Sequence, residues 1–317
     1  MQAQSFASTK ASASRTSGID DVAEFIQQVV AGLGDGAIYA SLALALVLIY
    51  RATHVINFAQ GEMGMFSTYI AWALITHHGW SFWPTFVFTV GISFLGGVGV
   101  HQAVIRPLQR AGELTVVMAT IALLVMLSGF ASWIWQPDEK VLESPLVGGT
   151  WSVGSVAIPQ QAVYDLLVVL GCVVVLWALF KFTKLGLALR ASAVNPAASR
   201  LLGVRVPWML SIGWGFAAVL SAIAGLLAAP AQFVFTPTFM QVVIIYAFAA
   251  AVLGGIESPV GAVIGGLTLG VTINLLGTYL PGQITPDMRL PVALAILLLV
   301  LVFRPSGLLG RTLVRRV

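Results

Sequence analysis

The sequence predicts an all-α protein, a polytopic bundle of about eight to ten transmembrane segments. Two observations indicate this fold. Only 9% of the 317 residues are charged, whereas soluble domains carry about 25% charged residues. Apolar segments also recur along nearly the whole chain, and most approach the roughly 20 residues that a helix needs to cross a bilayer. We therefore expect a single transmembrane domain over residues 20–310, with no room for a sizeable soluble domain.

Nine segments are predicted to be membrane helices. Three of them, 62–76, 241–254 and 290–303, are short for a full crossing, so we interpret them as half-helices, steep crossings or spans with polar extensions. The nine segments are 33–50, 62–76, 84–104, 115–135, 162–180, 207–229, 241–254, 259–278 and 290–303.

The two ends of the chain are expected to lie outside the bundle. Residues 1–19 are rich in Ser, Ala and Thr and lack the apolar core of a signal peptide, so they predict a disordered tail. Residues 20–31 predict a short amphipathic helix at the membrane surface. Residues 311–317 form a basic tail.

The basic residues predict which side of the membrane each loop faces, because cytoplasmic loops carry an excess of Lys and Arg. Nine crossings with the N-terminus outside and the C-terminus in the cytoplasm leave few basic residues outside, namely Lys10, Arg15, Lys140 and Arg289. Two of these lie on the N-terminal tail. An N-terminus inside, with one short segment dipping into the membrane instead of crossing, therefore stays open.

Motifs for several kinds of chemistry are absent from the sequence. GxxxxGK[ST], HExxH, GxSxG and paired cysteines do not occur. We expect no catalytic residues, no metal and no ATP-binding loop in this chain. Ion-coupled carriers place ionisable groups at membrane depth, and the candidates here are Asp35, Glu62 and Asp165. We expect Asp35 and Asp165 to be wetted at outer helix ends, which leaves only Glu62 for such a role.

The stretch HVINFAQGEMGMF, residues 54–66, places polar groups between two apolar segments. Irregular backbone at membrane depth must be buried in protein or line a cavity. Asn57, Gln60, Gly61 and Glu62 are therefore candidates for residues that border a substrate path or its gate. Glu62 also suits the first turn of a helix, where a carboxylate favours the positive end of the dipole. A plain loop with a capping glutamate is an equal alternative.

The stretch KLGLALRASAVNPAASRLLGVRV, residues 184–206, is the longest basic gap between apolar segments. Asn195 is a good N-cap, Pro196 suits the first helical turn, and Gly203 suits the position just past a helix end. These residues predict a short helix over 196–202. Because so short a helix is not stable alone, we expect it to pack against something else.

The sequence allows two interpretations of what this segment contacts. Ala198 and Leu202 lie on one side of it, which favours docking against a protein. The alternative is a basic loop held at anionic lipid by Arg190, Arg200 and Arg205.

The stretch VLGGIESPVGAVIGGLTLG, residues 252–270, combines a tight turn with regularly spaced glycines. Gly261 and Gly265, and likewise Gly266 and Gly270, are four residues apart, which places small residues on helix faces for close packing. A bent helix pair that borders a translocation path is the alternative.

Taken together, the sequence resembles the inner-membrane permease subunits of branched-chain amino-acid ABC importers of the LivH type. The resemblance covers roughly residues 26–310. It rests on YASLALALVLIYRATHVINFAQGEM, GLALRASAVNPAASRLLGVRV, VLGGIESPVGAVIGGLTLG and RPSGLLG.

The resemblance implies roles for two of these stretches. Asn57 to Glu62 match the family signature near the first crossings, and Gln60 stands where many relatives have His, so a histidine-based pH role is not expected. Segment 184–206 corresponds to the cytoplasmic coupling segment, although Ala197 departs from the general coupling pattern, which has Glu there. The coupling candidates are Arg190, Asn195, Ala198, Leu202 and Gly203.

The resemblance also implies partners. We expect two ABC ATPase subunits that hydrolyse ATP, a second identical or different permease subunit, and an extracytoplasmic solute-binding protein. This chain itself is expected in the lipid bilayer of the inner membrane, and no nucleic acid is expected as a partner. The expected substrates are branched-chain amino acids or related small polar solutes, with urea, amides or aromatic acids as alternatives. A stand-alone ion-coupled transporter or channel, and a purely structural membrane scaffold, remain rival classes.

Overall fold

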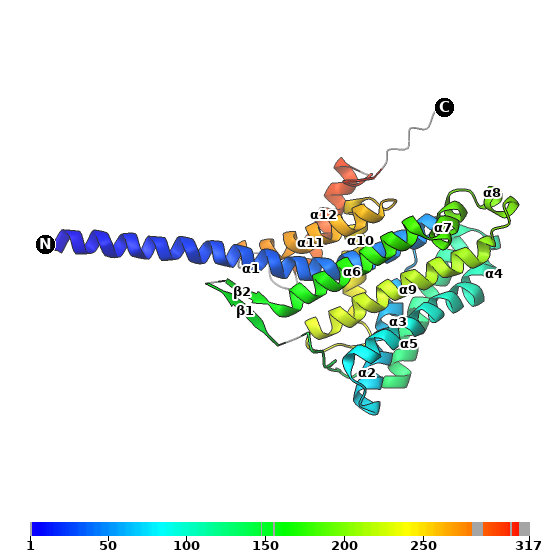
Figure 1. Cartoon of the computed structure of the whole chain (residues 1–317), viewed down its shortest axis with the longest axis horizontal. Coiled ribbons are helices and arrows are strands. Elements are labelled where there is room, and N and C mark those ends of the chain that lie inside the picture. Colours follow the sequence, from blue (N-terminus) through cyan, green and yellow to red (C-terminus); the bar gives the residue numbers. More distant parts are fainter. Residues whose placement is uncertain (1, 147, 155, 281–287, 305, 311–317) are drawn as a thin grey trace.

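The computed structural model describes residues 2–146, 148–154, 156–280, 288–304 and 306–310. Within these ranges the chain is a helical bundle with one β-hairpin (Figure 1). The predicted basic tail 311–317 lies outside the described residues. The elements are α1 (Gln2–Thr53), α2 (Gln60–His78), α3 (Phe82–Val100), a π-helical turn η1 (His101–Ile105), α4 (Arg106–Leu108), a 3-10 turn η2 (Gln109–Ala111), α5 (Glu113–Trp135), β1 (Thr150–Val153), β2 (Val156–Pro159), α6 (Gln160–Phe182), α7 (Lys184–Val194), α8 (Pro196–Leu201), α9 (Val206–Ala231), α10 (Phe239–Gly254), α11 (Pro259–Tyr279) and α12 (Arg289–Phe303).

The helical fold class is confirmed, and each of the nine predicted segments lies in a helix of the structure. Six helices are long and apolar enough to cross a membrane: α1, α3 with its continuation to Ala111, α5, α6, α9 and α11. The three segments predicted to be short correspond to α2, α10 and α12. Of these, α10 has 16 residues and α12 has 15.

The N-terminal region differs from the prediction. Instead of a disordered tail over 1–19 and a separate surface helix over 20–31, residues 2–53 form the single helix α1. Its N-terminal part projects beyond the rest of the bundle (Figure 1). The physical reason is that adding a residue to an existing helix costs far less than starting one. The packed part of α1 supplies that start, and the tail rich in Ser, Ala and Thr continues it.

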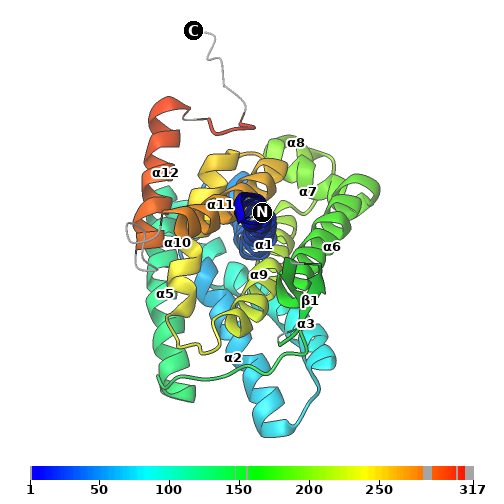
Figure 2. The same ribbon diagram turned by 90° about the vertical axis from the view of Figure 1, so that its left-hand side faces the viewer.

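The core lies around α1 and α9. In Figure 2, α1 is seen end-on in the middle of the bundle, with α6, α9 and α11 around it. The outer helices α3, α5, α6 and α12 keep large apolar side chains exposed, among them Val87, Leu95, Val125, Val174 and Val302. So extensive an exposed apolar surface marks contact with lipid.

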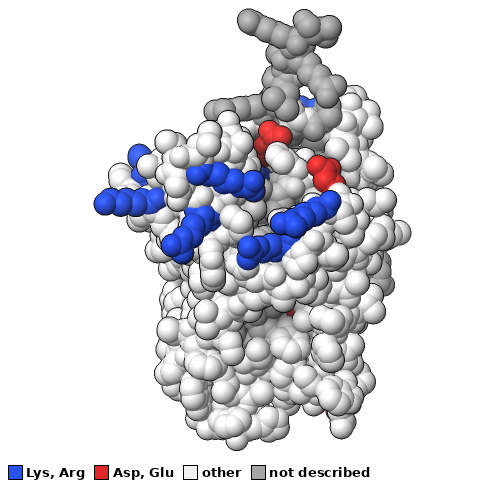
Figure 3. Space-filling model, turned by 90° about the vertical axis from the view of Figure 1, so that its right-hand side faces the viewer, with Lys and Arg blue, Asp and Glu red and all other residues white. Residues whose placement is uncertain are grey.

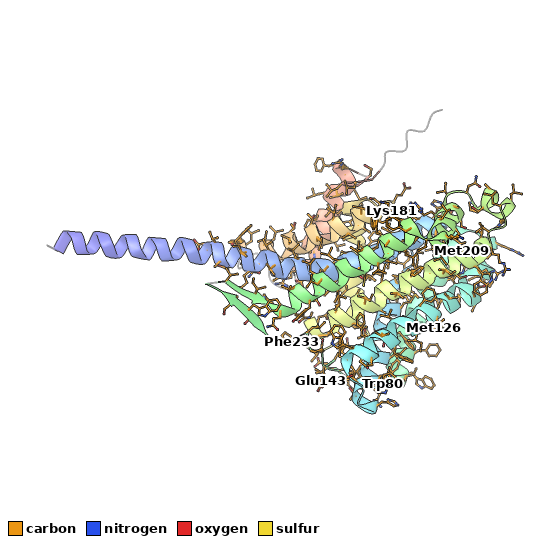
Figure 4. All side chains as sticks on the ribbon, viewed as in Figure 1. Trp80, Met126, Glu143, Lys181, Met209 and Phe233 are labelled. Carbon is orange, nitrogen blue, oxygen red and sulfur yellow. The ribbon has the colours of Figure 1, made fainter. Side chains whose placement is uncertain are left out.

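The two ends of the bundle differ in charge. Lys and Arg side chains gather on one end, which we call the basic end (Figure 3). Lys181 and Met209 lie toward it, Trp80, Glu143 and Phe233 lie at the opposite end, and Met126 lies between them on α5 (Figure 4). The loops with the most basic residues thus meet at one face. That this face is cytoplasmic stays a prediction.

Candidate functional site

The start of α2 lies inside the bundle. α1 ends at Thr53, and residues 54–59 lead back into the protein before α2 begins at Gln60. The side-chain nitrogen of Gln60 donates to the Ala217 carbonyl at 2.9 Å and to the Ser221 hydroxyl at 2.5 Å, both on α9. At about 1.5 Å per helical residue, these partners lie roughly 16 to 22 Å from the first residue of α9. α2 therefore begins near mid-depth of the bundle.

The polar side chains before α2 bond to one another and to the local backbone. The Asn57 side-chain oxygen Oδ1 accepts from the Ala59 amide at 3.1 Å, and the Asn57 side-chain nitrogen donates to Gln60 Oε1 at 2.7 Å. Both side chains are fully buried. Buried polar groups cost free energy unless they are hydrogen-bonded. These two amides therefore allow non-helical backbone to exist at this depth.

Glu62 lies in the first turn of α2, so its predicted position at a helix start is confirmed. Its side chain is only 1% exposed. The carboxylate lies near Gln241 of α10, yet neither of its oxygens has a hydrogen-bond partner among the described residues. A buried carboxylate without a partner is costly. The burial of the Glu62 carboxylate is therefore not offset by a hydrogen bond among the described residues, unlike the burial of Asn57 and Gln60.

Glycines let α2 pack closely against α9 and α10. A methyl group on Gly61 would lie 3.2 Å from the Met240 carbonyl oxygen, and one on Gly64 would lie 2.5 Å from the Ser221 carbonyl oxygen. On the facing helix, a methyl group on Gly225 would meet the Gly64 carbonyl at 2.8 Å. Gly61 is thus a packing position as well as a path candidate.

The structure brings Asn57, Gln60, Gly61 and Glu62 together at one point. They line neither of the two cavities described below. A role of these four residues in a path or gate stays a prediction.

The residues on α9 that contact this segment were not predicted from the sequence. Ser221 accepts from Gln60 at the start of α2. The neighbouring Leu220 carbonyl accepts from the Ser41 hydroxyl of α1 at 2.9 Å. One signal was available, because Ser221 and Gly225 are small residues four apart, the spacing that favours close helix contact in membranes.

Asp165 contradicts one expectation. It was expected to be wetted at an outer helix end, but it is 3% exposed, and its Oδ1 has no hydrogen-bond partner among the described residues. The reason is that α6 packs closely against α1, where a methyl group on Gly34 would lie 2.6 Å from Ala162. Asp35, on the same part of α1, is half-buried.

The predicted short helix exists as α8. Asn195 is its N-cap and accepts from the Ala198 amide at 2.9 Å, and Pro196 occupies the first turn. The helix ends at Leu201, one residue earlier than predicted, and Gly203 follows with a φ of +83°. The helix α7 that precedes α8 was not predicted. Its cap is the Thr183 hydroxyl, which accepts from the Gly186 amide at 3.0 Å.

α7 and α8 present apolar side chains away from the bundle. Leu201 is 90% exposed, Leu202 83% and Val194 81%, and α8 lies at the extremity of the bundle (Figure 1). Large side chains exposed to this degree mark a surface that contacts another molecule. Of the coupling candidates, Arg190, Asn195, Ala198 and Leu202 are all exposed.

The four glycines of α11 face two different helices. Gly261 and Gly265 face α10, where a methyl group on Gly265 would lie 2.8 Å from the Gly254 amide nitrogen. Gly266 and Gly270 face α1, and a methyl group on Gly266 would lie 2.5 Å from the Ala40 Cα. This geometry supports the packing interpretation for α11.

The last described residues fasten the turn between α10 and α11. The Leu308 amide donates to the Leu253 carbonyl at 2.7 Å, and the Leu309 amide donates to the Gly254 carbonyl at 3.0 Å. The final carbonyls of a helix have no partner within it, so this segment satisfies the end of α10. The motifs VLGGIESP and RPSGLLG thus form one structural unit.

A comparison with models of known protein families finds a match for this chain. The family model described as "Branched-chain amino acid transport system / permease component" matches residues 28–301, most of the chain. The chain belongs to this permease family. It is a multi-pass membrane permease, a class of transport component that is not itself an enzyme.

Curated relatives agree with this assignment over nearly their whole length. The high-affinity branched-chain amino acid transport system permease protein LivH of Escherichia coli (strain K12) is 29% identical over 306 residues, which cover 92% of this chain and 98% of LivH. The corresponding protein BraD of Pseudomonas aeruginosa is 31% identical over 94% of this chain and 99% of BraD. A solved structure, PsaBC from Streptococcus pneumoniae in complex with Fab, gives a TM-score of 0.48 at 14% identity, covering 90% of this chain and 97% of that one.

Proposed function

We propose that this permease is the membrane subunit of an ATP-driven importer for branched-chain amino acids or related small polar solutes. The observation that carries the proposal is the capped, outward-facing helix α8 on a chain that matches the permease family across residues 28–301. A subunit of an ATP-driven importer that has no ATP-binding motif of its own must receive its energy through a contact surface with the ATPase. The exposed apolar residues of α7 and α8 supply such a surface.

Two ABC ATPase subunits are the proposed partners of α8. A helix of six residues cannot hold its shape alone, so the Asn195 cap and the turn at Gly203 fix it for docking. Arg190, on the neighbouring helix α7, adds a cation beside the apolar contact. ATPase closure would then move α7 and α8 as a unit and shift the bundle between two states. The basic end is accordingly the proposed cytoplasmic end, and we propose a cytoplasmic C-terminus.

A second permease subunit and an extracytoplasmic solute-binding protein complete the proposed complex. The binding protein would capture the solute and deliver it to the permease. Urea, amide or aromatic-acid transport within the same architecture is the alternative for the substrate. The protein itself has no proposed cofactor, because ATP is used on the partner subunits.

The start of α2 is the proposed path or gate within this subunit. It combines non-helical backbone, the positive end of a helix and the unpartnered Glu62 carboxylate near mid-depth of the bundle. Transporters place substrate sites where helices are interrupted near the membrane midplane. Asn57 and Gln60 would hold this start in place, and Gly61 would let it approach α10.

The coupling role of α8 is tested with Leu202→Asp. This change puts a charge into the apolar docking surface, so the purified variant should fail to retain the ATPase subunits on pull-down. Phe233→Asp is the matched control, because Phe233 is 74% exposed but lies at the opposite end of the bundle (Figure 4). Retention of the ATPase subunits by Leu202→Asp would contradict the coupling role.

A second function is favoured by one specific observation. Glu62 and Asp165 are buried carboxylates with unpartnered oxygens, and buried acids in membrane spans mark ion or proton routes. A stand-alone ion-coupled transporter would therefore move solute into vesicles that contain this chain alone under an ion gradient.

A further inference from the structure

An apolar cavity of about 410 Å³ lies between α1, α6, α7, α9 and α11. We call it the α7 groove. Its walls are aliphatic and aromatic, apart from two arginines, Arg51 and Arg190. The apolar lining includes Leu48, Val173, Phe180, Met209 and Val263.

A second cavity of about 370 Å³ adjoins the α7 groove and is more polar. It shares Arg51, Ala193 and Pro259 with the groove and adds His54 and Glu257. Because Arg51 is in the last turn of α1, this polar mouth opens at the basic end of the bundle. The two cavities together form an amphipathic site with an apolar interior and a charged entrance.

The arginines at the entrance are available to a ligand. Both are exposed, and neither forms an ion pair with a carboxylate in the described part of the chain. Glu257 lines the second cavity but stays beyond ion-pairing distance of Arg51. Arginine binds phosphate through two parallel hydrogen bonds, so two free guanidinium groups suit an anionic phosphate.

We propose that the α7 groove binds an anionic phospholipid. One acyl chain occupies the apolar cavity, and the phosphate lies on Arg51 and Arg190. Four of the helices that line the groove, α1, α6, α9 and α11, are long and apolar enough to cross a membrane. Its α6 wall is the least buried of the six long spans, so lipid lies beside it. Basic pockets between transmembrane helices bind anionic headgroups in this way.

A solute amino acid fits this site less well. Its ammonium and carboxylate groups would both have to be bonded, whereas the interior offers apolar surface and the entrance is dominated by cations. Burial of an unpaired charge is costly. A phospholipid places only hydrocarbon in the interior and its charge at the entrance.

Occupancy would affect the segment that carries α8. Leu189, Arg190 and Ala193 of α7 form one wall of the groove, and α1, α9 and α11 form the facing wall. A bound lipid would therefore brace α7 against the core of the bundle.

The test uses native mass spectrometry on the purified full chain. Phosphatidylglycerol and phosphatidylcholine with identical acyl chains are added in turn, and glycerol phosphate serves as a probe of the headgroup alone. The wild-type chain should retain phosphatidylglycerol about tenfold more strongly than phosphatidylcholine, because the choline cation of phosphatidylcholine offsets the phosphate charge that the two arginines bind. It should retain no glycerol phosphate.

Two variants separate the headgroup from the acyl chain. The double variant Arg51→Gln with Arg190→Gln should lose the preference for phosphatidylglycerol, whereas Arg110→Gln with Arg200→Gln, also exposed at the basic end, should keep it. Gly213→Phe should fill the groove and abolish retention. Gly96→Phe is its control, because a methyl group at either glycine meets no atom within 4 Å, but only Gly213 lines the groove.

Several results would overturn the proposal. These are equal retention of the two lipids, undiminished retention by Gly213→Phe, binding of glycerol phosphate as strong as that of the lipid, or displacement of the lipid by leucine. Circular dichroism and gel filtration of each variant check that it is folded. The exposed arginine pair provides a test that does not depend on tolerance of the larger side chain.

Discussion

The side-chain nitrogen of Gln60 lies 2.5 Å from the Ser221 hydroxyl. This hydrogen bond joins the first residue of α2 to the middle of α9, and the two bonded residues are 161 positions apart in the sequence. Both side chains are fully buried, so the bond cannot be replaced by water. It fixes the depth at which α2 begins and hence the position of Glu62.

The first prediction concerns this bond. Gln60→Ala should lower the free energy of unfolding by about 1–3 kcal/mol, because Asn57 and Ser221 lose a buried partner. Ser221→Ala should cost less, since Gln60 keeps its bond to the Ala217 carbonyl. The double variant should be about 0.5–3 kcal/mol more stable than the sum of the single losses implies. Denaturation in mixed micelles measures all three, and strictly additive losses would show that the two side chains do not interact.

The second prediction concerns Glu62. Glu62→Gln keeps the size of the side chain and removes its charge. Because the carboxylate has no partner among the described residues, the variant should be at least as stable as the wild type, yet impaired in uptake with its assembly intact. Glu113→Gln, an exposed first-turn glutamate of α5, is the control. Wild-type uptake by Glu62→Gln would reduce Glu62 to a helix-start residue.

The third prediction concerns the cap of α8. Asn195→Ala should remove the bond to the Ala198 amide and cost about 0.5–2 kcal/mol of local helix stability. Because the rest of the bundle does not depend on α8, the thermal midpoint should stay unchanged while ATPase binding weakens. Asn195→Asp retains a capping oxygen and should bind normally. Equal ATPase binding by the Ala and Asp variants would show that docking does not require a preformed α8.

The fourth prediction concerns the contact between α10 and α11. Gly265→Leu should destabilise the bundle by about 1–3 kcal/mol or more, because the added atoms overlap the backbone of α10. Gly171→Leu on α6 should be tolerated, since a methyl group there meets no atom within 4 Å. Thermal unfolding of the two proteins in detergent distinguishes them. Equal midpoints would contradict the close packing of α11 on α10.

Local features were predictable from the sequence. The nine apolar segments and the cap of α8 follow from rules that act within a few residues: apolar length, the Asn195–Pro196 pair and the glycine at 203. The spacing of Gly261 and Gly265 likewise predicted small-residue helix faces.

Features that depend on distant contacts were not predictable. Nothing near Gln60 in the sequence indicates that its partners are Ala217 and Ser221. Asp165 lies near the start of its helix, which suggested exposure, but the packing of α1 against α6 buries it. The composition of residues 1–19 predicted a disordered tail. That composition does not indicate that residues 2–19 continue the packed part of α1.

Reconstituted uptake distinguishes ATP-driven import through this subunit from transport by this chain alone. Proteoliposomes containing this chain, its second permease subunit and the ATPase subunits are supplied with the binding protein and labelled leucine. We expect accumulation that requires ATP, and none in vesicles holding this chain alone under a proton or sodium gradient. Gradient-driven accumulation by this chain alone, without ATPase subunits, would contradict this expectation.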